Sequence, residues 1–229
     1  MRLYTTCRDC GTTLLMLDRF NPPTHPGCDT TPTFIESTLE RFLTAVRQGD
    51  QREADRLEQL VADATPRPTL ADTAMRYASQ FGWPVFPLAP GEKRPITRHG
   101  HKDATTDPDQ VRRWWLDTPN ANIGLPTGIL FDVVDIDVPN GSMAWADLQQ
   151  SGACPDIHGL VNTSSGGTHA YILPTGGGNL AGSIAPGIDY RGKGGFVVAA
   201  PSVRGDGKQW SWTTPPSPEI TDTKKRMAA

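Results

Sequence analysis

The sequence predicts an α/β fold, in which short strands alternate with amphipathic helices. Three segments are apolar and β-branched enough to be strands, and each carries a glycine-rich turn or acidic residues; they span residues 129–138, 160–173 and 187–200. Helical periodicity with capping residues runs from 69 to 81, begins again at 107, and recurs around 142–150. Elements of both kinds therefore interleave along the chain, which favours the α/β class.

Length and composition exclude several classes of protein. The chain has 229 residues, a formal net charge of −3 and 37% hydrophobic residues, which suits one good-sized domain with smaller attachments. The net charge gives no attraction to nucleic acid over the whole chain, so any such contact must come from local basic patches. No apolar run approaches the ~18 residues that span a bilayer, and the N-terminus lacks an apolar signal-peptide core. We expect a cytoplasmic protein without membrane contact.

Residues 1–30 carry two pairs of metal-ligand residues, Cys7 with Cys10 and His25 with Cys28, each separated by two residues. Structural zinc takes four such ligands in a tetrahedron. A segment this short has little core of its own, so a metal ion would hold it together. The spacing predicts a zinc-binding module at 1–30; the alternative is three unrelated free cysteines and a histidine in a loop.

The next segment, 31–66, predicts two amphipathic helices and a linker. The first carries an apolar stripe and ends at Gly49, and Asp50 with Glu53 resembles the capping box of the second. The main domain is expected at 67–212. Residues 213–229 are rich in Thr and Pro and contain a basic run, which is typical of a flexible tail.

The strand at 129–138 carries two acids, Asp135 and Asp137. Because side chains alternate along a strand, these carboxylates share a face and Asp132 lies on the opposite one. Adjacent carboxylates repel each other unless a cation lies between them, and Mg²⁺ and Mn²⁺ prefer oxygen ligands. The pattern predicts a metal site; the alternative is an edge strand whose acids face water.

The segment 160–173 predicts a strand, a turn at Ser165, Gly166 and Gly167, and a return strand that begins near His169. Backbone N–H groups in such a turn can approach an anion closely, and His169 could hydrogen-bond or charge-pair with a phosphate. The alternative is an ordinary hairpin turn with a structural histidine.

Two further cations lie on or directly after predicted strands. Asp189 and Arg191 are two residues apart and share a face of their strand, which suits a metal ion beside a triphosphate; the alternative is a surface ion pair. Lys93 lies on a turn after a predicted strand, where we expect a phosphate contact, and a solvated loop is the alternative.

The order of these units resembles the three motifs of the archaeo-eukaryotic primase superfamily: Asp-x-Asp on a strand, a Gly-Gly-x-His hairpin, then an Ile-Asp strand. The sequence is most similar to the bifunctional primase/polymerase (prim-pol) family of phages, plasmids and integrated elements, over residues 70–212. Flanking segments typical of that family lie at 82–87, 91–95, 101–105, 114–115, 121–124 and 194–202. An N-terminal zinc module beside this domain also fits the prim-pol family.

The resemblance implies a nucleotidyltransferase with a small mixed β-sheet flanked by helices, which synthesises primers on single-stranded DNA from nucleoside triphosphates. It assigns two Mg²⁺ or Mn²⁺ ions to Asp135, Asp137 and Asp189. It assigns the phosphates of the incoming nucleotide to His169, with Ser165, Gly166 and Gly167 lining the turn, and to Arg191 and Lys93.

Many members of the family carry a helicase on the same chain, whereas this sequence continues only a short way past Trp212. We therefore expect a separate replicative helicase, or a primase that is split between chains. Two other functions remain compatible with the sequence. One is a two-metal nuclease that uses the same three acids. The other is a catalytically silent replisome adaptor that binds DNA through the zinc module.

Overall fold

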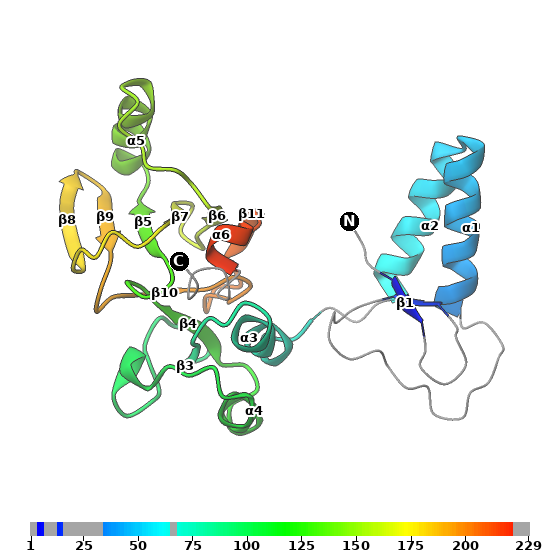
Figure 1. The fold of residues 1–229 in the computed structure, drawn as a ribbon, viewed down its shortest axis with the longest axis horizontal. Helices are drawn as coiled ribbons and strands as arrows, with labels where there is room; N and C mark the ends of the chain where they lie inside the picture. Colours follow the sequence, from blue (N-terminus) through cyan, green and yellow to red (C-terminus); the bar gives the residue numbers. More distant parts are fainter. Residues whose placement is uncertain (1–3, 7–12, 16–33, 65–67, 222–229) are drawn as a thin grey trace. The chain divides into compact units, whose positions relative to one another are not determined.

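The computed structural model describes residues 4–6, 13–15, 34–64 and 68–221. The chain divides into two compact units, Met1–Arg67 and Pro68–Ala229 (Figure 1). The four expected zinc ligands, Cys7, Cys10, His25 and Cys28, lie outside the described residues. The zinc module therefore stays a prediction.

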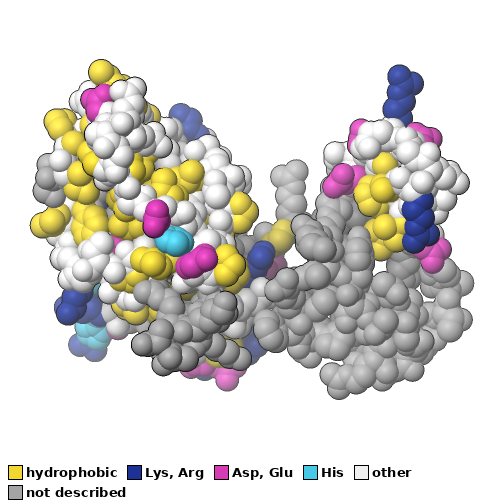
Figure 2. All heavy atoms as spheres, turned by 45° about the horizontal axis from the view of Figure 1, so that its top comes forward, with side chains coloured by type: hydrophobic (Ala, Val, Ile, Leu, Met, Phe, Trp, Pro, Cys, Tyr) yellow, Lys and Arg dark blue, Asp and Glu magenta, His cyan; other side chains and the backbone are white. Residues whose placement is uncertain are grey.

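The N-terminal unit contains the two expected helices, α1 (Phe34–Gln48) and α2 (Gln51–Ala64), and a pair of antiparallel strands, β1 (Tyr4–Thr6) and β2 (Thr13–Leu15). Gly49, with a φ of 74°, ends α1, and the Asp50 carboxylate accepts a hydrogen bond from the Glu53 N–H at 3.1 Å to cap α2. The helices bury a small core of Ala45, Ala54 and Leu57. Hydrophobic side chains lie between charged ones on the visible face of this helix pair (Figure 2).

The C-terminal unit is built on two antiparallel sheets. A three-stranded sheet has the order β10-β4-β3, and a six-stranded sheet has the order β11-β6-β7-β5-β9-β8. The strands of the smaller sheet are β3 (Phe86–Leu88), β4 (Asn122–Pro126) and β10 (Phe196–Val198). Those of the larger sheet are β5 (Asp132–Ile136), β6 (Gly159–Asn162), β7 (Thr168–Ile172), β8 (Leu180–Ala185), β9 (Ile188–Arg191) and β11 (Ser211–Thr214).

The expectation of one mixed sheet was wrong, because every ladder between these strands is antiparallel. The turn at 192–195 takes the chain from β9 in the larger sheet to β10 in the smaller one. Segment 187–200 therefore links two sheets, and the two stretches that flank its turn pair with β5 and β4 respectively.

Helices cover both sheets (Figure 1). They are α3 (Leu70–Ser79), the short 3-10 helix η1 (Gly100–Asp103), α4 (Pro108–Asp117), α5 (Asn140–Gln150) and α6 (Pro218–Thr221). The predicted starts of α3 and α4 are confirmed: Thr69 forms a capping box with Asp72, and the Asp107 carboxylate caps α4 ahead of Pro108. Helices α3 and α4 contact the smaller sheet, whereas α5 packs on β5 and β9.

The two sheets share one hydrophobic core, which lies around the fully buried Trp83. The Trp83 ring stacks on Tyr77 and on Tyr171, with centroids 5.4 Å and 6.1 Å apart. Strand β5 separates this core from a second one under α5: Val133 faces the first, whereas Val134 and Ile136 face the second. Asp135 therefore lies on the face of β5 that looks towards the smaller sheet.

The expected flexible tail at 213–229 was wrong for its first part. Strand β11 extends to Thr214 at the edge of the larger sheet, and α6 places the fully buried Ile220 in the core. The Trp83 indole N–H donates a hydrogen bond to the Ile220 carbonyl at 2.8 Å. A single apolar residue among Thr and Pro does not mark this docking in the sequence. Among the residues that the structure describes, no helix is long and apolar enough to cross a membrane.

Candidate active site

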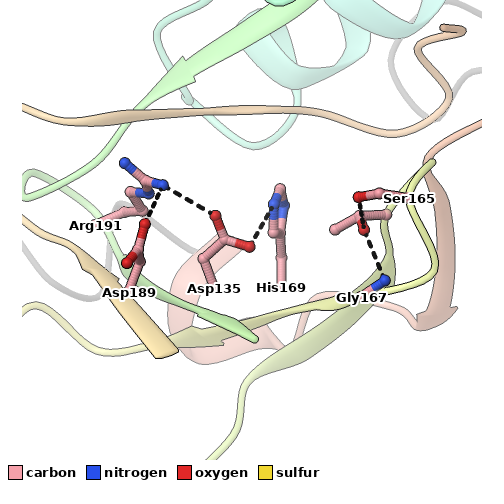
Figure 3. Close-up of polar contacts among 7 residues, drawn as sticks. Asp135, Ser165, Gly167, His169, Asp189 and Arg191 are labelled. Atoms are coloured by element: carbon pink, nitrogen blue, oxygen red, sulfur yellow. Dashed lines mark hydrogen bonds and ion pairs between the residues drawn. The ribbon is translucent and has the colours of Figure 1, made fainter. Parts of the chain in front are cut away.

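Three predicted site residues form a row across three neighbouring strands. Strand β5 lies between β7 and β9, and Asp135 is the register partner of both His169 on β7 and Asp189 on β9. Register partners in adjacent strands point to the same face of a sheet. The three side chains therefore stand side by side (Figure 3), although Asp135 and Asp189 are more than 50 residues apart in the sequence.

Arg191 joins the two carboxylates of this row. Its Nη2 atom lies 2.6 Å from Asp189 Oδ2 and 3.2 Å from Asp135 Oδ2, while His169 Nε2 lies 3.5 Å from Asp135 Oδ1 (Figure 3). The side chains are partly or largely buried: 6% of His169, 16% of Asp135 and 28% of Arg191 remain exposed. Low exposure strengthens these electrostatic contacts relative to surface pairs.

Asp137 follows directly after β5, and glycines fix its backbone. Its N–H donates to the Gly187 carbonyl at 2.8 Å, and its carbonyl accepts from the Gly141 N–H at 2.8 Å. Gly187 has a φ of 78°, and a Cβ built there would lie 2.4 Å from the Gly141 nitrogen. Only glycine allows this close approach. The same turn leads into β9, so it positions Asp137 and Asp189 together.

Two acids of this cluster, Asp135 and Asp137, have raised pKa values. Burial raises the pKa of Asp135 above its usual range; Arg191 and Lys93 lower it in part, and Asp189 raises it. Partial burial raises the pKa of Asp137, and repulsion by Asp135 and Asp189 raises it further. The formal charges also do not balance, because the three carboxylates of Asp135, Asp137 and Asp189 lie near only two cations, Arg191 and Lys93. Such a cluster attracts an additional cation.

His169 is neutral at physiological pH. Burial lowers the pKa of its imidazole to about 3, and the charges of Lys93 and Arg191 contribute to that shift. Of the two contacts that the sequence allows between His169 and a phosphate, a neutral ring supports the hydrogen bond and not the charge pair.

A pocket of about 300 Å³ opens beside this row, between the larger sheet and β10. The expected site residues Asp135, His169, Arg191 and Lys93 line it. Lys93 comes from the loop after β3, and its Nζ lies 5.8 Å from the centre of the Trp210 ring. The remaining lining residues are His101, Asn179, Gly194, Gly195, Phe196, Val197, Val198 and Trp210.

The turn at 163–167 lies at the end of β5 and does not line that pocket. The N–H groups of its two glycines are engaged within the turn: Gly166 N–H donates to the Thr163 carbonyl and Gly167 N–H to the Thr163 hydroxyl, both at 3.0 Å. The Ser165 hydroxyl lies 3.1 Å from that of Thr163 (Figure 3). A Cβ at Gly167 would lie 2.4 Å from the Ile136 carbonyl oxygen. The close packing of this turn on β5 explains the glycine without any anion.

The chemistry of the three carboxylates fits a divalent cation of the Mg²⁺ or Mn²⁺ type, which prefers hard oxygen ligands. Two of them, Asp135 and Asp189, already converge on one positive group. Within the described part of the chain, no three His, Cys, Asp or Glu side chains are arranged as a formed metal site. Arg191 instead occupies the position between the two acids. A metal ion shared by both carboxylates requires this guanidinium to move.

Sequence reasoning missed several residues that line the pocket together with Asp135. His101 and Phe196 lie in segments typical of the prim-pol family, but no local chemical pattern marks either one as part of a site. Asn179 carries no local signal at all. Phe196 shares the pocket with Asp135 only because the two sheets pack together.

Comparison with known proteins agrees with the geometry. The family model described as "Bifunctional DNA primase/polymerase, N-terminal" matches residues 74–224, which is more than half of the chain. The match covers every element of the row and of the pocket. No curated protein matches the chain. The chain is therefore a member of the bifunctional DNA primase/polymerase (Prim-Pol) family.

Proposed function

We propose that the C-terminal unit synthesises primers on single-stranded DNA from nucleoside triphosphates by two-metal nucleotidyl transfer, in the replication of a phage, plasmid or other mobile element. The observation that supports this best is the in-register row of His169, Asp135 and Asp189 beside a pocket. It joins metal-binding and phosphate-binding chemistry on one sheet face, within a family of DNA primases and polymerases.

The residues of the row would divide the work of nucleotidyl transfer. Asp135, Asp137 and Asp189 would hold Mg²⁺ or Mn²⁺, which when bound activate the primer 3′-hydroxyl and neutralise the leaving pyrophosphate. Arg191 would exchange its carboxylate partners for triphosphate oxygens, since a guanidinium binds both groups through the same paired N–H donors. Lys93 would add a second positive charge to the triphosphate.

His169 would hydrogen-bond to a phosphate oxygen through its neutral ring. The imidazole is nearly buried, so its orientation is fixed before substrate arrives. A fixed neutral donor orients the phosphate and leaves the charge balance to Arg191 and Lys93. The turn at Ser165, Gly166 and Gly167 would support this histidine and the end of β5. The Ser165 hydroxyl would be the group of this turn that contacts a nucleotide.

The test is de novo synthesis by the purified chain on single-stranded DNA with Mg²⁺ or Mn²⁺. Labelled ribonucleotides and deoxyribonucleotides are supplied in separate reactions, and products are separated by size. We expect labelled products that grow with time and require template. Shortening of the DNA without labelled product would identify a nuclease, and DNA binding with neither reaction would identify an adaptor.

The N-terminal unit would contribute a zinc module through Cys7, Cys10, His25 and Cys28, which would help to hold the template or the initiating nucleotide. A separate helicase would supply unwound DNA. The net charge of −3 supports this need for partners, because phosphate contacts from basic residues supply most non-specific affinity for DNA.

A further inference from the structure

The pocket beside the catalytic row is lined by two chemically different groups of side chains. One group is charged: Lys93 and Arg191 both act on the pKa values of Asp135 and His169, so these four groups lie within electrostatic reach of one another. The other group is aromatic and includes His101 and Phe196, whose rings stack with centroids 6.1 Å apart and planes 21° apart. Neither ring has a role in the mechanism described above.

Packing fixes the rings of His101 and Phe196. Phe196 on β10 meets Phe86 on β3 edge-on, with ring centroids 5.4 Å apart, and Phe86 is fully buried. The three rings thus run from the core of the smaller sheet to the pocket, and His101, which is half-buried on η1, is the last of them. His99, two residues earlier, differs: its ring is 60% exposed and pairs with Asp103 at 2.9 Å.

We propose that the His101–Phe196 stack is the platform for the nucleobase of the incoming nucleoside triphosphate, whose phosphates bind Lys93 and Arg191 in the same pocket. This inference rests on the proposed function. A nucleotide combines a polyanion with a flat aromatic ring, and the charged and the aromatic side chains of the pocket match these two parts. Stacking on aromatic side chains contributes to affinity for any base, because every base has a π-face. A template-directed enzyme needs such tolerance, since base pairing with the template makes the selection.

Binding measurements without template separate the base from the phosphates. We would titrate the full chain, in Mg²⁺, with ATP, dATP and inorganic tripolyphosphate by calorimetry. The variants are His101→Ala, His101→Phe and the control His99→Ala. For the tighter of the two nucleotides, we expect His101→Ala to weaken binding by about tenfold or more and to leave tripolyphosphate binding unchanged. His101→Phe, which keeps a stacking ring, and His99→Ala should bind nucleotide as the wild type does.

The outcomes separate this inference from the proposed function. Nucleotide binding that is unchanged in His101→Ala, or equal losses for nucleotide and tripolyphosphate, would overturn the platform and leave the catalytic assignment in place. Loss in His101→Phe equal to that in His101→Ala would show a polar contact instead. Failure of the wild-type chain to bind either nucleotide would also overturn the platform, whereas the proposed function fails only if the synthesis assay gives no template-dependent product. Thermal unfolding checks each variant, and His101→Leu replaces His101→Ala if the latter does not fold.

Discussion

His169 and Asp135 are cross-strand partners on β7 and β5, and His169 Nε2 lies 3.5 Å from Asp135 Oδ1. The pair is nearly buried and the imidazole is neutral, with a pKa of about 3. A neutral ring cannot offset the charge of Asp135, so that task falls to Arg191 on the other side of the carboxylate. The charge of Asp135 is therefore balanced by Arg191, a side chain that could exchange this carboxylate for another anion.

Arg191→Gln should change metal and nucleotide binding in opposite directions. The guanidinium occupies the position between Asp135 and Asp189, so its removal should tighten Mn²⁺ binding in the absence of nucleotide. The same change should raise KM for the nucleoside triphosphate about tenfold or more, because a charge-assisted contact is lost. Calorimetric titration with Mn²⁺ and steady-state kinetics measure the two effects.

The matched control for this variant is Arg204→Gln, which removes a half-buried arginine that pairs with Asp206 outside the pocket. It should leave both quantities unchanged. Weaker Mn²⁺ binding in Arg191→Gln would show that the guanidinium supports the metal site and does not compete for it.

Gly187→Ala should harm the site more than Gly176→Ala, although both glycines have positive φ angles, 78° and 82°. A Cβ at Gly176 meets no atom within 4 Å, whereas one at Gly187 lies 2.4 Å from the Gly141 nitrogen. Gly176→Ala should therefore cost only the backbone strain, about 1–2 kcal/mol of unfolding free energy, and keep primer synthesis. Gly187→Ala should cost more and reduce synthesis, because the turn that holds Asp137 must shift. Urea unfolding and synthesis assays on both variants decide; equal effects would contradict this explanation.

Tyr77 should make stability depend on pH in alkaline solution. Its buried hydroxyl donates to the Ala200 carbonyl at 2.6 Å and accepts from the Trp212 indole N–H at 2.8 Å. Burial raises the pKa of Tyr77 to about 12, whereas an unfolded tyrosine ionises near 10. Unfolding thus releases a proton between pH 10 and 12, and wild-type stability should fall as pH rises through this window, by up to about 1.4 kcal/mol per pH unit from this group.

Tyr77→Phe isolates this contribution, because it lacks the ionisable hydroxyl. The wild type should be more stable than Tyr77→Phe by about 1–3 kcal/mol at pH 8, since the variant leaves a buried carbonyl and indole N–H without their partner. This advantage should shrink steadily between pH 10 and 12 in urea unfolding. A difference that stays constant over that range would show that the hydroxyl ionises as readily in the folded chain.

The purified chain should contain about one equivalent of zinc. Cys7→Ser should remove it, because the loss of one of four ligands opens a tetrahedral site. Cys154, a free and partly buried cysteine in the described part of the chain, provides the control, and Cys154→Ser should retain the metal. Elemental analysis of the three proteins decides. Zinc that persists in Cys7→Ser would assign the metal to other residues.

Local alternation along β5 was enough to separate its acids. The sequence predicts Asp132 on the face opposite to Asp135, and the structure places it there, fully buried, where it accepts hydrogen bonds from the Thr175 N–H at 2.7 Å and from the Tyr190 hydroxyl. The helix starts at Thr69 and Asp107 were equally local, since a side chain caps a helix within three residues.

Features that depend on contacts between distant segments could not be predicted from local sequence patterns. The register that brings His169 and Asp189 to either side of Asp135 depends on pairing between distant strands, which no local pattern determines. The division into two antiparallel sheets follows from a turn at 192–195 whose sequence would suit a hairpin equally well. The stacked rings of His101 and Phe196 are 95 residues apart in the sequence, and packing alone brings them together.

Primer synthesis by Asp135→Asn, measured beside Asp132→Asn, tests whether the acids of β5 catalyse nucleotidyl transfer. Both changes remove one carboxylate from the same strand, but only Asp135 faces the pocket. We expect Asp135→Asn to lose synthesis by about a thousandfold or more, because metal stabilisation of the transition state is worth several kcal/mol, while the chain stays folded. Asp132→Asn should cost about 1–3 kcal/mol of stability and keep synthesis at a temperature where it is folded. Synthesis at the wild-type rate by folded Asp135→Asn would contradict the assignment of this row as the catalytic site.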